Sequence, residues 1–317
     1  MELFWIFLGA AAFLMAAVLV IAYICFRMAF YVPPRKPGTG DEIQFPEGEI
    51  YDPYREKMEK WTRETRQLPQ QTLTIRSFDG LTLYGTYYEY APGAPIELMF
   101  HGYRGSAERD LSGGVQRCFK LGHSALIVDQ RCSSRSQGSV ITFGIYEHRD
   151  CLAWLELMEE KFGPDARIIL TGLSMGAATV LMAAGKPLPK TVIGVLADCG
   201  YSAPGDIMKQ VIRQMGLPAG LVYPFVRLGA KLYGKFDPDS YSPVEAMKTC
   251  TVPVIFFHGE SDDYVPCDMS RRVYDACTSR KKLVTVPDAG HGLSYPVAPA
   301  AYLEALREFF GLEASAQ

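Results

Sequence analysis

The sequence lacks the features of several large classes of protein. Among its 317 residues, 35 acidic side chains slightly outnumber 32 basic ones, and no long run of one charge occurs. Nothing in the sequence is basic enough for binding nucleic acid, so no nucleic-acid partner is expected. With 48% hydrophobic and 21% charged residues and no repeat, the chain is expected to fold as one large α/β domain with accessory segments.

Signatures of a bound cofactor or metal are also missing. No glycine-rich phosphate-binding loop occurs, and no spacing of His, Cys and Asp resembles a metal site, so no cofactor and no metal are predicted. The eight cysteines do not have the paired spacings of a disulfide framework. One of them, Cys25, lies in an apolar run, and the other seven are expected to be mostly buried free thiols.

Charge is absent from one long segment near the amino terminus. Residues 3–26 hold no charged side chain, and these 24 residues, at about 1.5 Å each, would cross a hydrocarbon core of roughly 30 Å as a helix. A cleaved signal peptide is the alternative, but no basic region precedes the run and no A-x-A site closes it. We therefore expect residues 1–32 to be a retained, single-pass anchor in the lipid bilayer. Arg27, Arg35 and Lys36 follow the span, which predicts that the carboxyl-terminal domain faces the cytoplasm.

The remaining chain divides by composition and hydrophobic period. Residues 33–70 are expected to be a linker followed by a charged helix, and residues 71–198 and 249–317 to be two parts of an α/β core. Asp79-Gly80 marks a hairpin, and helical segments separate the later strands, which implies a mostly parallel sheet with helices on both faces. Eight strands are predicted, at 72–78, 81–90, 96–100, 125–129, 167–171, 192–197, 252–257 and 282–286.

One long segment interrupts the alternation of strands and helices. Residues 199–248 hold no strand pattern but two apolar, helix-like stretches, at 203–215 and 218–233. An insertion of this length between core strands is typical of a lid over an active site. A helical extension of the core is the alternative.

The strongest chemical signal is Gly172-Leu173-Ser174-Met175-Gly176, which lies between an apolar strand and a helix of small residues. This context is typical of a nucleophile elbow, a strained turn that exposes a serine hydroxyl at the edge of a sheet. Glycine is needed on both sides because a Cβ there would collide with the neighbouring strand or helix. Ser174 is therefore the candidate nucleophile.

A serine hydroxyl attacks only when a base takes its proton and a carboxylate orients that base. In this arrangement the acid and then the base follow the serine along the chain. Of five histidines, only His258 and His291 lie beyond the insertion, and His291 is the candidate base because its loop is flanked by glycines and follows the last strand. Asp262 is the candidate acid. Three other carboxylates remain alternatives for this role: Glu260, Asp263 and Asp198.

A tetrahedral intermediate carries an oxyanion, which requires preorganised N–H donors. The backbone N–H of Met175 is one candidate donor because it directly follows the nucleophile. The backbone N–H of Tyr103, in the loop after the third strand, is the other. His101 in the same loop is expected to hold the loop and not to act as a second base.

Together these motifs resemble the α/β-hydrolase superfamily, in particular the bacterial membrane-anchored hydrolases related to the prolyl-oligopeptidase-like and Bem46-like groups. The resemblance extends from about residue 50 to 312 and is carried by residues 101–103, 129–132, 172–176, 198–201, 258–266 and 290–292. Cys132 stands where the family's D-x-R-G turn has glycine. The fold implied is an α/β-hydrolase with a helical lid insertion and an amino-terminal transmembrane helix.

The resemblance implies a serine hydrolase that forms an acyl-enzyme with a small-molecule ester or acyl substrate. The apolar lid and the membrane tether favour lipid-derived esters or thioesters. A serine peptidase of the prolyl-oligopeptidase type and a catalytically silent membrane-bound scaffold are the alternatives. The oligomeric state stays open.

Overall fold

Eight strands form one sheet in the computed structural model, which describes residues 1–33, 42–46 and 48–311. The order is β1-β2-β4-β3-β5-β6-β7-β8. Strand β2 pairs antiparallel with β1 and with β4, and the other pairs are parallel, as the sequence predicts. The strands are β1 (Gln71–Arg76), β2 (Thr82–Tyr88), β3 (Ile96–Phe100), β4 (Ser124–Asp129), β5 (Ile168–Leu173), β6 (Val192–Asp198), β7 (Val254–Gly259) and β8 (Lys281–Val286).

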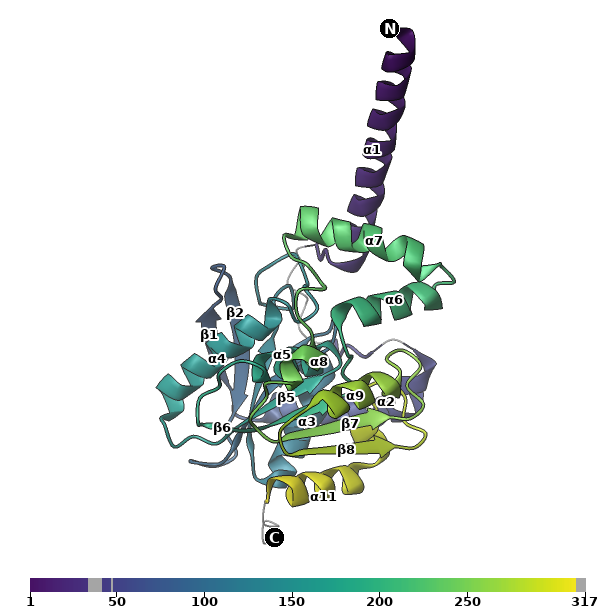
Figure 1. Cartoon of the computed structure of the whole chain (residues 1–317). Coiled ribbons are helices and arrows are strands. Elements are labelled where there is room, and N and C mark those ends of the chain that lie inside the picture. The colour runs from purple at the N-terminus through teal and green to yellow at the C-terminus, as the bar shows by residue number, and fades with distance from the viewer. Residues whose placement is uncertain (34–41, 47, 312–317) are drawn as a thin grey trace.

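Helices cover both faces of the sheet (Figure 1). Every residue of β3 and β7 is buried, as expected for strands that pack against helices on both sides. Leu98 and Phe100 of β3 join one apolar cluster, whereas Met99 between them joins another on the opposite face. The first face packs against α4 (Glu147–Phe162), α5 (Met175–Ala184), α8 (Pro243–Met247) and α9 (Cys267–Ala276), and the second against α3 (Ala107–Leu121) and α11 (Pro299–Phe310).

The region between residues 42 and 70 precedes the sheet. A 3-10 helix, Glu49–Tyr54, leads into α2 (Arg55–Gln67), and a short helix α10 (Ser294–Val297) precedes α11. The ring of Trp61 on α2 stacks on Tyr295 of α10, with ring centroids 5.4 Å apart. Residues 34–41 and 47 of the predicted linker, which include Arg35 and Lys36, lie outside the described residues, as do residues 312–317.

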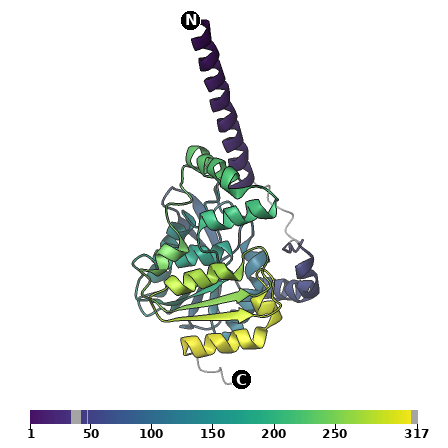
Figure 2. The ribbon, with the colours of Figure 1, turned by 45° about the vertical axis from the view of Figure 1, so that its right-hand side comes forward.

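The predicted insertion is helical. It comprises α6 (Pro204–Gln214), α7 (Ala219–Gly229), a π-helical turn (Ala230–Gly234) and α8. Helix α7 packs directly on the amino-terminal helix α1 (Glu2–Ala29), because Gly229 has no side chain: a Cβ there would lie 2.3 Å from the carbonyl oxygen of Ala22. Figures 1 and 2 both show α1 projecting away from the sheet at the side where α7 lies.

The carboxyl-terminal end of α1 is part of the folded domain. Phe26, Phe30 and Val32 are buried in one apolar cluster with Met175, the residue after the candidate nucleophile. Backbone hydrogen bonds join this end to residues 139–141, from Val32 N to Ser139 O and from Ile141 N to Phe30 O, both 2.9 Å. Helix α1 is thus attached to the core at its carboxyl-terminal end. It is also long and apolar enough to cross a membrane.

Candidate active site

Ser174 lies in the sharp turn between β5 and α5. Its backbone has φ +56° and ψ −116°, a strained conformation for a residue with a side chain. A Cβ at Gly172 would lie 2.2 Å from the carbonyl carbon of Gly176, and one at Gly176 would lie 2.0 Å from Phe100 O. Close backbone contacts thus require glycine at both positions, for the steric reason expected from the sequence.

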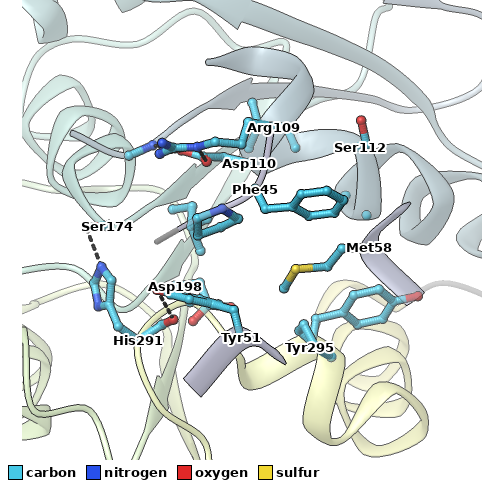
Figure 3. Close-up of a pocket in the computed structure, with 18 of the residues that line it drawn as sticks. Phe45, Tyr51, Met58, Arg109, Asp110, Ser112, Ser174, Asp198, His291 and Tyr295 are labelled. Carbon is cyan, nitrogen blue, oxygen red and sulfur yellow. Dashed lines mark hydrogen bonds and ion pairs between the residues drawn. The ribbon is translucent and has the colours of Figure 1, made fainter. Parts of the chain in front are cut away.

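Ser174, His291 and Asp262 form a continuous hydrogen-bonded chain. Figure 3 shows the bond between Ser174 and His291. The distance from Ser174 Oγ to His291 Nε2 is 2.9 Å, and from His291 Nδ1 to Asp262 Oδ2 it is 2.7 Å. The serine follows β5, the aspartate lies in the loop after β7, and the histidine lies in the loop after β8. Their side chains meet because carboxyl-terminal ends of parallel strands share one edge of the sheet.

The Asp262 carboxylate is buried and fully hydrogen-bonded. Its Oδ1 accepts from the backbone N–H groups of Tyr264 at 3.0 Å and Val265 at 2.8 Å. Burial by itself would raise the pKa of Asp262, but hydrogen bonds from His258 and His291 outweigh it and lower the pKa to about 2. The side chain is therefore an anion at neutral pH, as a residue that orients a histidine must be.

The three alternative acids have other partners. Asp198 accepts hydrogen bonds from Ser294 Oγ at 2.8 Å and Tyr302 Oη at 3.1 Å. Glu260 accepts one from Thr285, and Asp263 contributes its backbone carbonyl to Gln214. Of the four carboxylates, Asp262 is thus the one that is hydrogen-bonded to His291.

His258 is buried next to Asp262. Its Nδ1 is 2.7 Å from Ser270 Oγ, its Nε2 is 2.8 Å from Val265 O, and Asp262 Oδ2 lies 3.3 Å from the same Nε2. It contacts the acid and not the serine, so its place agrees with a structural role.

The loop that holds Tyr103 lies beside the serine, since a Cβ at Gly102 would be 3.6 Å from Ser174 Cβ. His101 fastens this loop: its Nδ1 is 2.8 Å from Gly102 O, and its Nε2 accepts a hydrogen bond from Gln130 N. Met175 begins helix α5, so its N–H belongs to the helix N-terminus, where such groups have no intrahelical partner. The two proposed oxyanion donors therefore belong to two different segments that both adjoin Ser174.

Several residues next to these groups have no signal in the sequence. Asp110 Oδ2 accepts from Gly102 N at 3.0 Å and so fixes the same loop. Tyr51 donates a hydrogen bond to His291 O at 3.0 Å, and the ring of Tyr264 stands edge-on to His291, with centroids 5.1 Å apart. Tyr51 and His291 are 240 residues apart, so no local pattern could have indicated their contact.

Cys132 takes the conformation expected of the glycine it replaces. Its φ is +67°, in the left-handed region that favours glycine. The turn of the D-x-R-G type is thus kept in spite of the substitution, with some strain in the backbone.

A cavity of about 1150 Å³ opens beside Ser174 and His291 (Figure 3). Its apolar wall includes Phe45, Met58 and Trp61, and the polar side includes Arg104 and Asp110. Residues 199–248, all of which the structure describes, contribute nothing to its lining; described residues between 42 and 62 cover it instead. The role of the insertion as a lid therefore stays a prediction, and another segment encloses this cavity.

One cluster in the described residues brings metal-binding side chains together: Cys199, Asp262 and His291, with ligand atoms within 4.8 Å of one another. Burial, followed by the charges of Asp198 and Asp262, raises the pKa of the Cys199 thiol well above its ordinary value. A metal would need the thiolate and would also displace the hydrogen bond between Asp262 and His291. The donor set therefore does not fit a metal.

Comparisons with known proteins agree with this architecture. The sequence model of the prolyl oligopeptidase family matches residues 142–315. The chain is similar to protein YqkD of Bacillus subtilis, with 28% identity over 190 residues that cover 60% of this chain and 62% of YqkD, so the match spans less than two thirds of that relative.

Solved structures resemble it in fold. The Pyrococcus furiosus esterase Pf2001 has a TM-score of 0.67 and 19% identity, with 89% of this chain and 97% of that chain covered. A puromycin-hydrolysing peptidase of Mycobacterium tuberculosis has a TM-score of 0.59 and 16% identity, with 79% and 40% covered. At such low identity the likeness concerns the fold, which is that of the α/β-hydrolases.

Proposed function

The chain belongs to the prolyl oligopeptidase family, and from this premise we propose that it is a membrane-anchored serine hydrolase that cleaves carboxylic esters with apolar acyl groups. The observation that carries the proposal is the hydrogen-bonded chain Ser174–His291–Asp262 at the wall of a cavity of about 1150 Å³. A serine connected in this way to an ionised aspartate through a histidine has the geometry of an activated nucleophile.

In the proposed mechanism, Ser174 Oγ attacks the acyl carbon while His291 Nε2 takes its proton. Asp262 holds the ring so that Nε2 faces the serine, and it stabilises the imidazolium that forms. The N–H groups of Tyr103 and Met175 stabilise the oxyanion. His291 then donates its proton to the leaving alcohol, and a water molecule activated by the same histidine releases the acid.

The lining of the cavity supports an apolar acyl group. Its lining includes the aromatic and aliphatic side chains of Phe45, Met58, Trp61 and Tyr295. Sites of this size and character bind mostly by removing apolar ligand surface from water. A thioester would present the same acyl carbon to Ser174.

The base of α1 supports a retained anchor. Phe30 is completely buried in the domain, and Phe26 is 5% exposed. Removing these residues with a signal peptide would leave an apolar hollow in the core. Arg27 at the end of the helix favours a domain on the cytoplasmic side, which protease accessibility in sealed vesicles would test.

Peptide hydrolysis is the second candidate, favoured by the family and by the mycobacterial neighbour. An aminopeptidase would need a pair of free carboxylates for the substrate amine. In the described residues, the carboxylates at the cavity are Glu42, Asp110 and Asp198. Asp110 and Asp198 are hydrogen-bonded within the protein, which argues for esters over peptides.

The first experiment labels the full-length chain in detergent with a fluorophosphonate probe. We expect Ser174→Ala to lose the label and to lower ester hydrolysis by about 10⁴-fold or more. Ser240→Ala is the control, because this side chain is exposed and bonds only within its own turn, and it should label like the wild type. Labelling of Ser174→Ala at the wild-type level would refute the proposed nucleophile.

A second experiment compares substrates. Nitrophenyl esters from acetyl to myristoyl should show kcat/KM rising with chain length until the cavity is filled. Aminoacyl nitroanilides should be poor substrates. Faster turnover of the nitroanilides would establish the peptidase instead.

A further inference from the structure

Helix α1 has no buried residue over a length that matches a bilayer. Ala22 is the first residue of α1 that is buried, and between Glu2 and Ile21 only Ala17 and Val18 are even half-buried. These 20 residues, at about 1.5 Å each, span about 30 Å, which is the thickness of a hydrocarbon core. A membrane around α1 would therefore end close to Ala22.

The insertion meets α1 at this same level. Gly229 of α7 lies against Ala22, Tyr233 Oη donates a hydrogen bond to Leu19 O at 3.2 Å, and the rings of Tyr23 and Tyr233 are 5.1 Å apart. Figures 1 and 2 show α7 lying across the base of α1. Helix α7 and the π-helical turn thus lie where the bilayer surface would be.

Apolar side chains of the insertion are concentrated in this place. Among the described residues that follow α1, nine large apolar or aromatic side chains are strongly exposed, and five of them fall between residues 215 and 233. Leu221 is 71% exposed, more than any of the other eight. Residues 214–226 hold no charged side chain. The five are Met215, Leu217, Leu221, Leu232 and Tyr233.

Basic and aromatic side chains border this surface. Arg213 and Lys235 are exposed at its two ends, and Arg27 of α1 lies over the ring of Tyr31 at 4.0 Å. The nearby Asp237 is neutralised by Arg227 and Lys231, both at 2.8 Å. Apolar residues next to exposed cations and tyrosines are typical of segments that lie in a membrane interface and contact anionic lipids.

We propose that residues 213–235 lie in the interfacial layer of the leaflet from which α1 emerges, with Leu217 and Leu221 among the lipid chains. This proposal rests on the anchoring part of the proposed function. It gives the insertion a role other than closing the cavity: it fixes the domain against the bilayer surface. Tyr103, which lines the cavity, also donates a hydrogen bond to Ala29 O at 2.7 Å, so the cavity wall and the base of α1 are in contact.

Quenching of tryptophan by brominated lipids tests this placement. Full-length Trp5→Phe protein is reconstituted in vesicles of phosphatidylcholine and phosphatidylglycerol, with or without bromine on the acyl chains. Leu221→Trp is added in one sample and Tyr90→Trp in the control, since Tyr90 is 45% exposed and lies at the other end of the sheet, next to Ser124. We expect the emission that Leu221→Trp adds to be blue-shifted and quenched, and the emission that Tyr90→Trp adds to be neither.

The alternatives give different spectra. If the added emission of Leu221→Trp matches that of Tyr90→Trp, the surface faces water. If it is blue-shifted without quenching, a second copy of the chain covers the surface. Both results overturn the proposal.

A further sample tests the proposed membrane anchor separately from the proposed position of residues 213–235. In a protein that keeps Trp5, quenching of Trp5 reports that α1 lies in the bilayer. Quenched Trp5 together with an unquenched Leu221→Trp variant would leave the anchor intact and refute only the placement of the insertion. Unquenched Trp5 would refute both.

Discussion

At the scale of single residues, the turn at Ser174 depends on glycines that have no side chain. Gly176 lies so close to β3 that a methyl group would overlap the carbonyl oxygen of Phe100. We expect Gly176→Ala to lose more than about 4 kcal/mol of folding free energy or to fail to fold, because two backbone segments would have to separate. Gly220→Ala is the control, as a Cβ there meets nothing within 4 Å. Thermal unfolding in detergent measures both, and equal midpoints would contradict the close contact.

Asp262 is expected to serve catalysis and stability together. Asp262→Asn cannot orient His291 in the same tautomer, and we expect kcat/KM to fall by about 10⁴-fold. Ser174 and His291 themselves are unchanged in this variant, so fluorophosphonate labelling should slow without disappearing. If the variant kept more than about a tenth of the wild-type kcat/KM, the acid would have to be another carboxylate.

The low pKa of Asp262 predicts a specific acid sensitivity. The pKa is about 2 in the folded protein against an ordinary 3.8, so the ionised carboxylate stabilises the fold above pH 4. That contribution, about 2 kcal/mol, is lost as the pH falls from about 4 to about 2. The unfolding midpoint of the wild type should therefore fall more steeply over this range than that of Asp262→Asn. Parallel curves would contradict the assignment.

At the scale of secondary structure, the core elements could be predicted from the sequence because their signals are local. The strand at 96–100 is observed as Ile96–Phe100, and the hairpin at Asp79-Gly80 joins β1 and β2 as expected. The position of β4 between β2 and β3 could not be derived from periodicity, since strand order depends on contacts between distant segments. For the same reason the contribution of described residues between 42 and 62 to the lining of the cavity could not be predicted.

The candidate site also contains residues that the sequence could indicate and residues that it could not. Ser174, His291 and Asp262 are indicated by short motifs and by their order along the chain, and the structure brings them together. Tyr51 and Asp110 are not indicated, because their contacts with the site arise only from tertiary packing, and Tyr264 lies in the motif 258–266 without an assigned role.

The contact between α1 and α7 gives a prediction for these two elements. Gly229→Val would place a branched side chain against Ala22 O and push α7 away from α1, which should cost about 1–3 kcal/mol. Hydrogen exchange should then quicken in residues 219–234. Gly220→Val adds the same side chain to the same helix without a neighbour and should leave exchange near residue 229 unchanged. Unchanged exchange in both variants would show that the contact is not needed for stability.

At the scale of the whole molecule, the packing of the end of α1 against the domain predicts that the two unfold as one cooperative unit. Deleting residues 1–32 would remove Phe26, Phe30 and Val32 from the cluster that contains Met175, and would leave Tyr103 without its acceptor on Ala29. We expect the truncated chain to unfold at lower temperature and to hydrolyse even short, soluble esters more slowly than the full chain in detergent. Equal activity and stability would show that α1 serves as a tether alone.

The bridge between Tyr31 and Val140 also has a consequence for biogenesis. The helix leaves the ribosome well before its binding site on the domain, which includes Ile141, Met175 and Val226 and is synthesised more than a hundred residues later. Under the proposed anchoring, a helix this apolar would enter the bilayer before those residues exist. The domain would then complete its folding on a segment of the same chain that already resides in the membrane, and the last step of maturation would take place at the lipid surface.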